Sequence, residues 1–486
     1  MHKGWAMNSR RFGLLLFVFG GALLLSPASG FAAQAVTTRA SIDSTGVEGN
    51  GDSSDSSISA DGRYMAFHST AVNLVSGDLN GTWDVFVRDR QTGATTRISV
   101  DSSGVQGNGA SYDPSISADG RYVAFWSRAD NLVTGDTNFI FDIFVHDRQT
   151  GATTRVSVYS GGVQGNGGSY DPSISADGRY VAFDSTAVNL VTGDTNATGD
   201  VFVHDRQTGA TTRVSVDSSG VQGNGGSYRP SISADGRYVA FDSTADNLVT
   251  GDTNATDDVF VHDRQTGATT RVSVDSSGGQ GDNGSYRPSI SADGRYVAFE
   301  ADASNLVSTD TNITGDVSVH DRQTGATTRV SVDSSGGQGD NGSYRPSISA
   351  DGRYVAFGSG ASNLVTGDTN AMEDVFVHDR RTGATIMVSV DSSGVQGNGG
   401  SYRPSISADG RYVAFDSTAD NLVTGDTNAA YDVFVRGPLV SFPWPMFLPA
   451  ITHKANYQVR SGNCLVGGDS YQGQGRAGGD ALTCGE

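Results

Sequence analysis

The sequence predicts an all-β protein, a seven-bladed β-propeller with four antiparallel strands in each blade. The main evidence is a repeat with a fixed period, since the string Ser-Ala-Asp-Gly-Arg-Tyr occurs seven times at a spacing of 58 residues. A period near 50 residues that contains several short strands is typical of a propeller or a solenoid. The 65 glycines in 486 residues agree with many tight turns and exclude a coiled coil. The aspartates of the repeated string are Asp61, Asp119, Asp177, Asp235, Asp293, Asp351 and Asp409.

The third copy shows how one unit divides into strands and connections. Alternating apolar and polar residues predict strands at 171–175, 179–185, 200–205 and 211–216. Asp-Gly and Thr-Gly turns join the first pair and the last pair of strands, because both sequences favour tight hairpins. Long polar segments make the other two connections. Successive connections of an antiparallel sheet lie at opposite ends, so each blade has a short-loop face and a long-loop face.

The two ends of the repeat array predict that the ring is closed. The last copy stops after its third strand, at Arg436, whereas residues 37–42 match the fourth-strand pattern Thr-Thr-Arg-Val-Ser-Val. The N-terminal strand can therefore complete the last blade, which leaves no free sheet edge. The alternative is an open solenoid, which needs polar caps that neither end of the array resembles. We expect the propeller to span residues 37–436.

The N-terminus predicts that the protein is exported. Lys3, Arg10 and Arg11 precede an apolar run at 12–25, and small residues follow Pro27, an order typical of a secretory signal peptide. We expect a signal peptide at 1–32 and a secreted, periplasmic or cell-envelope protein with no membrane span after cleavage. The alternative is an uncleaved anchor.

The C-terminal segment differs in composition from the repeats. Residues 437–486 are rich in proline and then in glycine, and we expect this tail to be largely disordered. Cys464 and Cys484 are the only cysteines, and in an exported chain the simplest interpretation is one disulfide between them.

One stretch of the repeat resembles a known family. Pro-Ser-Ile-Ser-Ala-Asp-Gly-Arg-Tyr-Val-Ala-Phe, at residues 172–183, is similar to the TolB-like, WD40-like propeller repeat, and so is the hairpin that follows it. The resemblance covers 37–436 and implies a propeller of the cell envelope or exterior, usually a binding scaffold. Two departures stand out: alanine replaces the usual proline, and the loop between the second and third strands is longer and more acidic.

The long-loop face carries a regular acidic motif, Asp-x-Asn-x-x-x-Asp. Calcium prefers about six to eight oxygen ligands, and three side chains in one short turn can supply part of that set. We therefore predict possible calcium sites there; the alternative is that these residues only form turns and cap the third strand. In chain order, the motif residues are Asp78, Asn80 and Asp84; Asp136, Asn138 and Asp142; Asp194, Asn196 and Asp200; Asp252, Asn254 and Asp258; Asp310, Asn312 and Asp316; Asp368, Asn370 and Asp374; and Asp426, Asn428 and Asp432.

The copies differ at a few positions, and these differences suggest a ligand-binding region. One first-strand position is aspartate in blades one to three and arginine in blades four to seven. If it lines the channel, the channel mouth has two oppositely charged halves; the alternative is a late duplication of four blades. Aromatic residues vary at the loop tips, at Trp83, Phe139, Phe141 and Tyr431. Clustered on one arc, they could stack on a sugar or anchor a protein.

The sequence favours a binding module over an enzyme. It contains no Gly-x-Ser-x-Gly, His-Glu-x-x-His or Cys-x-x-Cys motif. The alternative is a carbohydrate-active propeller, either a lectin or a glycoside hydrolase or lyase, because acids are frequent on the long-loop face. We expect a monomer that binds protein or carbohydrate on that face. The net charge of −20 disfavours nucleic acid as a partner.

Overall fold

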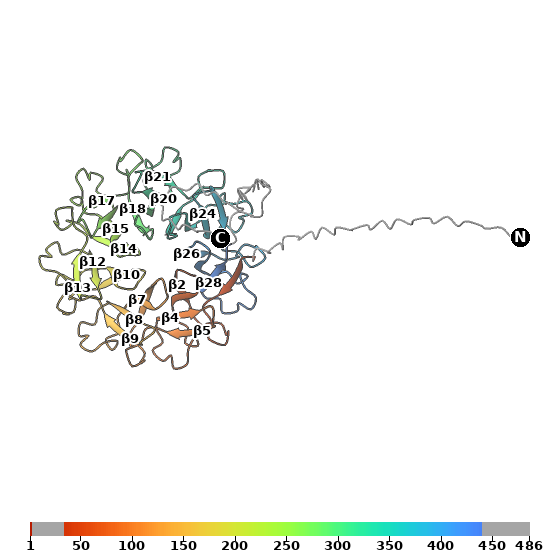
Figure 1. Cartoon of the computed structure of the whole chain (residues 1–486), viewed down its shortest axis with the longest axis horizontal. Coiled ribbons are helices and arrows are strands. Elements are labelled where there is room, and N and C mark those ends of the chain that lie inside the picture. The colour runs from red at the N-terminus through yellow and green to blue at the C-terminus, as the bar shows by residue number, and fades with distance from the viewer. Residues whose placement is uncertain (2–33, 440–486) are drawn as a thin grey trace. The chain divides into compact units, whose positions relative to one another are not determined.

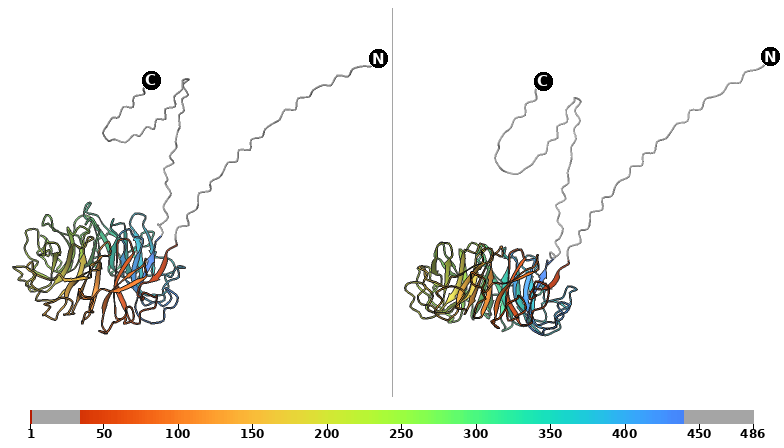
Figure 2. Two further views of the ribbon diagram at one scale, coloured as in Figure 1. Left: turned by 60° about the horizontal axis from the view of Figure 1, so that its bottom comes forward. Right: turned by 90° about the horizontal axis from the view of Figure 1, so that it is seen from below.

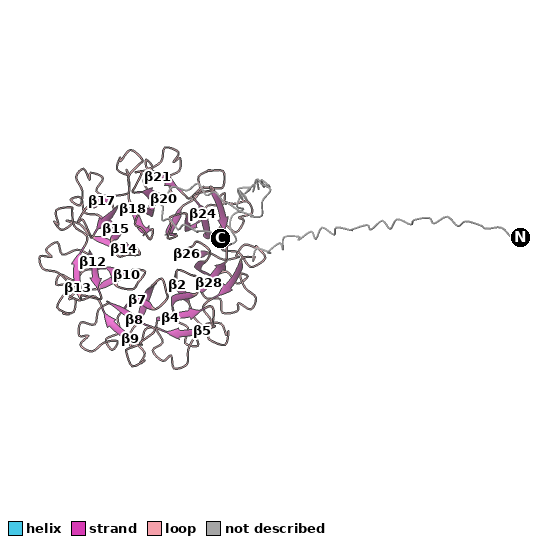
Figure 3. Cartoon of the chain, in the orientation of Figure 1, coloured by secondary structure: helices cyan, strands magenta, loops and turns pink. Residues whose placement is uncertain are grey.

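The computed structural model describes Met1 and residues 34–439, and seven four-stranded antiparallel sheets follow one another round a ring (Figure 1). These residues contain strands and turns, with no helix among them (Figure 3). No helix within this part of the chain is long and apolar enough to cross a membrane. The predicted seven-bladed fold is thus confirmed. The predicted signal peptide (1–32), most of the predicted tail (437–486) and the Cys464–Cys484 pair lie outside the described residues.

Each blade contributes four strands, numbered outward from the channel. The first strands are β2 (Ser53–Ile58), β6 (Ser111–Ile116), β10 (Ser169–Ile174), β14 (Ser227–Ile232), β18 (Ser285–Ile290), β22 (Ser343–Ile348) and β26 (Ser401–Ile406). The second strands are β3 (Tyr64–Ser69), β7 (Tyr122–Ser127), β11 (Tyr180–Ser185), β15 (Tyr238–Ser243), β19 (Tyr296–Ala301), β23 (Tyr354–Ser359) and β27 (Val413–Ser417).

The outer two strands of each blade complete the sheet. The third strands are β4 (Asp84–Asp89), β8 (Asp142–Asp147), β12 (Asp200–Asp205), β16 (Asp258–Asp263), β20 (Asp316–Asp321), β24 (Asp374–Asp379) and β28 (Asp432–Gly437). The fourth strands are β5 (Ala94–Arg97), β9 (Ala152–Arg155), β13 (Ala210–Arg213), β17 (Thr269–Arg271), β21 (Thr327–Arg329), β25 (Ala384–Met387) and β1 (Val36–Arg39).

Two strand boundaries in the third blade differ from the prediction by more than one residue. The first strand begins at Ser169, two residues early, because a β-bulge between Tyr170 and Ser173 lets pairing continue on both sides of it. The fourth strand ends at Arg213, earlier than predicted, and Val216 instead bridges to Gln222 within the following loop.

The N-terminal strand closes the ring, as the sequence predicts. Strand β1 pairs antiparallel with β28, with Thr37 opposite Arg436 and Thr38 opposite Val435. The last sheet therefore has the order β1-β28-β27-β26. The first and last segments of the propeller lie side by side in Figure 1 and in both views of Figure 2. Strand β28 then has a partner on each side and presents no unpaired edge.

The hydrophobic core consists of seven similar clusters, one between each pair of neighbouring blades. In one of them, Ile143 and Val145 of the second blade pack against Val181 and Phe183 of the third. In six of the seven blades a phenylalanine ring of the second strand stacks on one of the third strand, as for Phe183 and Phe202 with centroids 6.0 Å apart. Each blade is thus stabilised mainly by its neighbours, which is why the array must be continuous.

A closed circle of backbone hydrogen bonds joins the blades near the short-loop face. The N–H of the alanine in each Ser-Ala-Asp-Gly turn donates to the carbonyl of the corresponding alanine in the next blade, at 3.0–3.1 Å. The circle ends where it begins, since Ala408 donates to Ala60. Proline has no N–H. This explains why alanine replaces the proline of the resembling repeats. The members are Ala60, Ala118, Ala176, Ala234, Ala292, Ala350 and Ala408.

We predict that Ala234→Pro lowers the free energy of unfolding by about 1–3 kcal/mol, because it removes one donor from this circle and leaves a carbonyl without its partner. Urea unfolding followed by circular dichroism measures the change. Ala234→Ser keeps the N–H and is the matched control. Equal stability of the two variants would show that the circle contributes nothing.

Candidate functional site

The first strands enclose the central channel, a cavity of about 530 Å³. Its walls repeat one segment from each blade, such as Arg229, Pro230 and Ser231 of β14. The side chain at the first of these positions sets the charge of the channel. It is Asp55, Asp113 and Asp171 in blades one to three, and Arg229, Arg287, Arg345 and Arg403 in blades four to seven. The channel therefore has an acidic half and a basic half, which follow one another round the ring.

The backbone at this charged position is unusual in all seven blades. Each residue has a positive φ, between 43° and 53°, and lies within the β-bulge of its first strand. This left-handed conformation costs a non-glycine residue of the order of 1 kcal/mol. The bulge directs the backbone N–H toward the preceding blade. There Arg229 N donates to Asp184 Oδ1 at 3.3 Å, and Asp113 N donates to His68 Nδ1 at 3.1 Å.

These contacts identify a second ring of variable residues, which sequence reasoning missed. They lie near the long-loop end of the second strands, directly after the constant Ala-Phe pair. The signal was present in the sequence, because this position varies from blade to blade while the Ala-Phe pair before it is constant. The residues are His68, Trp126, Asp184, Asp242, Glu300, Gly358 and Asp416.

Carboxylates of the second ring form ion pairs with the arginines of their own blades. Arg229 Nη1 lies 3.3 Å from Asp242 Oδ2, and Arg403 Nη1 lies 3.0 Å from Asp416 Oδ2. Arg287 Nη1 lies 3.0 Å from Glu300 Oε2. Burial nevertheless raises the pKa of Asp242 to about 7 and that of Asp416 to about 8, and the arginines only partly oppose the shift. The channel mouth thus contains carboxyl groups that hold protons near neutral pH.

The acidic half contains a histidine between two aspartates. His68 Nε2 lies 3.6 Å from Asp55 Oδ2, and His68 Nδ1 lies 3.6 Å from Asp113 Oδ1. Burial lowers the pKa of His68 to about 4, so its ring is neutral at physiological pH. One atom from each of the three residues lies within 4.8 Å of the others, a separation that a metal ion could bridge. Asp55 is also paired with Arg403, at 3.1 Å.

Aromatic side chains form an arc over blades one to three. Of the four aromatic residues singled out from the sequence, Trp83 contacts His68 with centroids 4.8 Å apart. Phe141 contacts Trp126 at 4.6 Å, and Trp126 in turn stacks on Tyr112 at 4.5 Å. We call Trp83, Tyr112, Trp126, Phe141 and Tyr170 the aromatic arc.

The other two predicted aromatic residues lie apart from this arc. Phe139 is the most exposed of the four, at 64%, on the same loop as Phe141. Tyr431 belongs to blade seven, where its ring lies 6.1 Å from that of Tyr402. The structure therefore brings Trp83 and Phe141 into one cluster and pairs Tyr431 with a different tyrosine.

The acidic loop motif brings its two aspartates together in each blade, but other side chains lie between them. In blade two, Gln164 Nε2 donates to Asp136 at 2.7 Å and to Asp142 at 2.8 Å. Arg155 Nη1 lies 3.4 Å from the carboxylate of Asp136 and 3.5 Å from that of Asp142. The glutamine recurs in blades one to six and the arginine in blades one to five and seven.

The asparagine of the motif shapes its own loop. Asn138 Oδ1 accepts a hydrogen bond from Ile140 N at 3.2 Å, and its Nδ2 donates to Gly165 O at 2.9 Å. The first of these bonds is an Asx turn, the alternative interpretation of the motif. Both bonds recur in the other six loops, at Asn80, Asn196, Asn254, Asn312, Asn370 and Asn428.

The seven asparagines therefore form turns at the positions where the sequence predicts calcium ligands. Each amide oxygen already accepts a backbone hydrogen bond, and each amide nitrogen donates to a glycine carbonyl of the following connection. A carbonyl oxygen has two lone pairs, so one stays available to a cation. Ligation of calcium by these asparagines stays a prediction, whereas their role in the loop is a direct observation.

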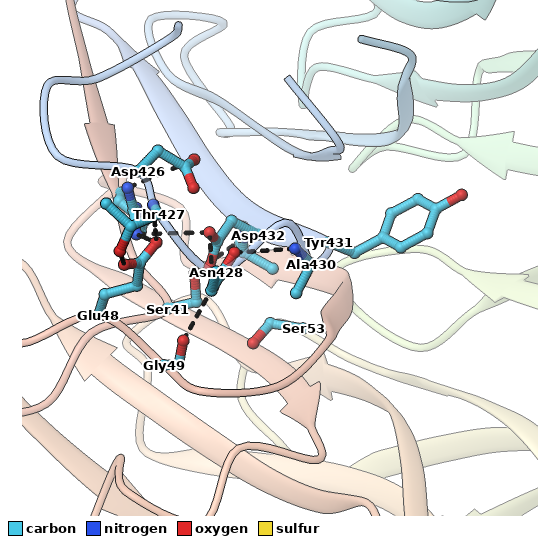
Figure 4. Close-up of polar contacts among 12 residues, drawn as sticks. Ser41, Glu48, Gly49, Ser53, Asp426, Thr427, Asn428, Ala430, Tyr431 and Asp432 are labelled. Carbon is cyan, nitrogen blue, oxygen red and sulfur yellow. Dashed lines mark hydrogen bonds and ion pairs between the residues drawn. The ribbon is translucent and has the colours of Figure 1, made fainter. Parts of the chain in front are cut away.

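Two of the seven loops depart from this arrangement. In blade seven, Glu48 takes the place of the glutamine and lies beside Asp426 and Asp432, with atoms of all three within 4.8 Å of one another (Figure 4). Arg39 forms ion pairs with all three carboxylates. Burial, reinforced by the neighbouring acids against the effect of Arg39, raises the pKa of Asp426 to about 7. In blade six, Met387 replaces the arginine beside the two aspartates of the motif.

Comparisons with known proteins show the fold alone. No family model matches the chain, and no curated protein is similar to it in sequence. Among solved structures, an oligogalacturonate lyase in complex with manganese is 13% identical with a TM-score of 0.51, over 84% of this chain and 94% of that one. TolB from Acinetobacter baumannii is 16% identical with a TM-score of 0.38, and the match covers 70% of this chain and 64% of the TolB chain. The propeller domain of the Trilobed protease from Pyrococcus furiosus is 10% identical with a TM-score of 0.48, and the match covers 79% of this chain and 95% of that domain.

We predict that the protein becomes less stable as the pH rises from 6.5 to 8. The folded pKa of Asp416, about 8, is above its unfolded value near 3.9, so unfolding releases a proton throughout this window. Each such proton contributes a slope of up to about 1.4 kcal/mol per pH unit. Asp416→Asn should reduce the slope measured by urea unfolding between pH 6 and pH 8.

The control for this prediction is Asp205→Asn. Arg179 holds the pKa of Asp205 far below its usual value, so this group stays charged in both states above pH 6. Its replacement should lower stability equally at pH 6 and pH 8. A slope that is the same in Asp416→Asn as in the unsubstituted protein would contradict the prediction.

Proposed function

We propose that this protein is an exported binding module that takes an acidic saccharide into the long-loop mouth of its channel. The observation that carries the proposal is the run of four arginines on consecutive blades, at one level of the channel. The aromatic arc lies over the remaining three blades of the same ring. Guanidinium groups bind carboxylates and sulfates through paired hydrogen bonds, and aromatic faces stack on sugar rings. The repeated framework supplies a rigid ring, and the variable positions supply the contacts.

A protein partner is the alternative ligand. The proposal favours a saccharide because the arginine-lined channel is a polar cavity of about 530 Å³, whereas protein interfaces are usually broad with an apolar centre. One of the structurally similar proteins is an oligogalacturonate lyase, which motivates acidic saccharides as the first compounds to test. The sequence gives a lyase or hydrolase as the second candidate function. The binding experiment described next also tests for that activity.

We expect the mature protein to retain uronate- or sulfate-bearing oligosaccharides on a glycan array in preference to neutral ones. Binding should weaken as salt rises, because charged contacts are screened. Arg287→Gln combined with Arg403→Gln should reduce affinity at least tenfold, since each lost charged hydrogen bond is worth about 1.5–3 kcal/mol. Isothermal titration calorimetry measures the affinity.

The matched control is Arg237→Gln, which removes an arginine of the same charge from the short-loop turn, where it pairs with Asp263 at 2.7 Å. It should leave saccharide binding unchanged. Retention of neutral and acidic glycans to the same extent would overturn the proposal. Shortened saccharides in the mass spectrum of the bound material would instead favour the enzyme alternative.

We also propose that calcium binds in two of the seven acidic loops, those of blades six and seven. Two aspartates and one arginine leave a local charge of −1 in blades one to five. Loss of the arginine at Met387 gives −2 in blade six, and Glu48 gives −2 in blade seven despite Arg39. Hard cations prefer such oxygen-rich, negatively charged loops.

Millimolar calcium should raise the midpoint of thermal unfolding of the mature protein by a few degrees over the value in EDTA, because a ligand that binds only the folded state stabilises it. Glu48→Gln together with Met387→Arg restores both loops to the pattern of the other five blades and should abolish this difference. Magnesium at the same concentration controls for ionic strength. A calcium shift that survives both substitutions would show that the ion binds elsewhere.

A further inference from the structure

Blade six lacks the carboxylate that accompanies the channel arginine in the other basic blades. Blades four, five and seven carry Asp242, Glu300 and Asp416 at the second-ring position, within 3.0–3.3 Å of their own arginines. The corresponding residue of blade six is Gly358. Arg345 instead forms an ion pair with an aspartate of blade one, in which the distance from Arg345 Nη1 to Asp55 Oδ1 is 3.8 Å. Its side chain is 40% exposed.

A second cavity of about 330 Å³, which shares three arginines with the channel, opens beside Arg345. Arg287, Arg345 and Arg403 contribute its basic side. The remaining lining residues are Tyr344, Glu373, Tyr402 and Tyr431. The pocket therefore combines three guanidinium groups with three phenol rings and one carboxyl group.

The glycine and the glutamate of this pocket fit together. A Cβ placed on Gly358 would lie 2.4 Å from Glu373 Oε1, so the glutamate occupies the space that a second-ring side chain fills in other blades. Burial raises the pKa of Glu373 to about 7, and Arg345 and Arg403 only partly oppose this. Arg287 and Arg403 each have a carboxylate of their own. Arg345 is thus the one channel arginine of the basic blades without a second-ring carboxylate, and the acid of its own blade in the pocket is Glu373.

We propose that this pocket binds the carboxylate of one acidic sugar residue, with Arg345 as its main partner, an inference that rests on the proposed function. The planar guanidinium presents two parallel N–H groups that match a carboxylate. The exposed rings of Tyr344 and Tyr431, at 39% and 37%, can pack on the sugar and donate to its hydroxyl groups. A pocket of this volume suits one monosaccharide unit rather than a chain.

The chain itself offers the substitution that tests this. Gly358→Asp with Glu373→Tyr reproduces the pair Asp416 and Tyr431 of blade seven, in which the aspartate binds its own arginine at 3.0 Å. The second substitution also removes the side chain that a Cβ at position 358 would meet. The double variant therefore keeps a combination that the same fold already contains, while giving Arg345 an internal carboxylate.

Calorimetry with a hexuronate monosaccharide, its methyl ester and inorganic phosphate provides the readout. The unsubstituted protein should bind the hexuronate at least tenfold more tightly than the ester or phosphate. The double variant and Arg345→Gln should each lose at least tenfold in hexuronate affinity. Unchanged affinity in either variant, or equal binding of the ester, would overturn the proposal. Tighter binding of phosphate would assign the pocket to a phosphate group instead, which also overturns it.

The acidic oligosaccharide separates this inference from the proposed function. If the double variant binds the oligosaccharide as the unsubstituted protein does, while Arg287→Gln with Arg403→Gln does not, the channel mouth is the site and the pocket is not. If the unsubstituted protein binds neither the oligosaccharide nor the hexuronate, both proposals fail.

Discussion

Hydrogen bonds between successive blades are the constraint on which the rest of this structure depends. The circle of alanine backbone bonds near the short-loop face runs from each blade to the next and returns to its start. A second circle lies in the channel wall, where each first-strand isoleucine N–H donates to a serine hydroxyl of the preceding blade, as Ile232 does to Ser173 at 3.1 Å. Both circles hold the first strands at a constant distance from the axis. The channel, and the level at which its charged side chains meet, follow from them.

A constant framework with a few variable positions gives the molecule an asymmetric site. The core residues, the turns and the inter-blade bonds repeat almost unchanged, whereas the charged first-strand position and the second-ring position differ between blades. Both lie toward the long-loop ends of their strands, so their differences accumulate at one mouth of the channel. There, burial raises the pKa of several carboxyl groups that the neighbouring arginines only partly counteract. Strongly shifted pKa values in a charged cavity are found both at functional sites and in structural networks of ion pairs.

The acidic loops show how a repeated motif can have a structural role and still allow exceptions. In blades one to five, a glutamine amide and an arginine bring the two aspartates together, and the asparagine closes an Asx turn. The aspartates were recognisable from the sequence because of their spacing. Their partners were not, since Gln164 lies 28 residues from Asp136 and on a different connection. Only when those partners are known do Glu48 and Met387 stand out as departures.

The sequence by itself determined the number of blades, the four strands of each blade and the closure by the N-terminal strand. These features depend on the alternation of apolar and polar residues, on turn residues and on the period of the repeat, all of which can be read from the sequence. It also indicated the change from aspartate to arginine round the ring. Tertiary structure alone decided which side chains meet, because the blades bring together residues that are far apart in sequence. Arg287 and Tyr431 line one pocket although 144 positions separate them. Within that pocket, Glu373 occupies the space that Gly358 leaves. The consequence of a missing side chain thus depends on what the surrounding residues place beside it.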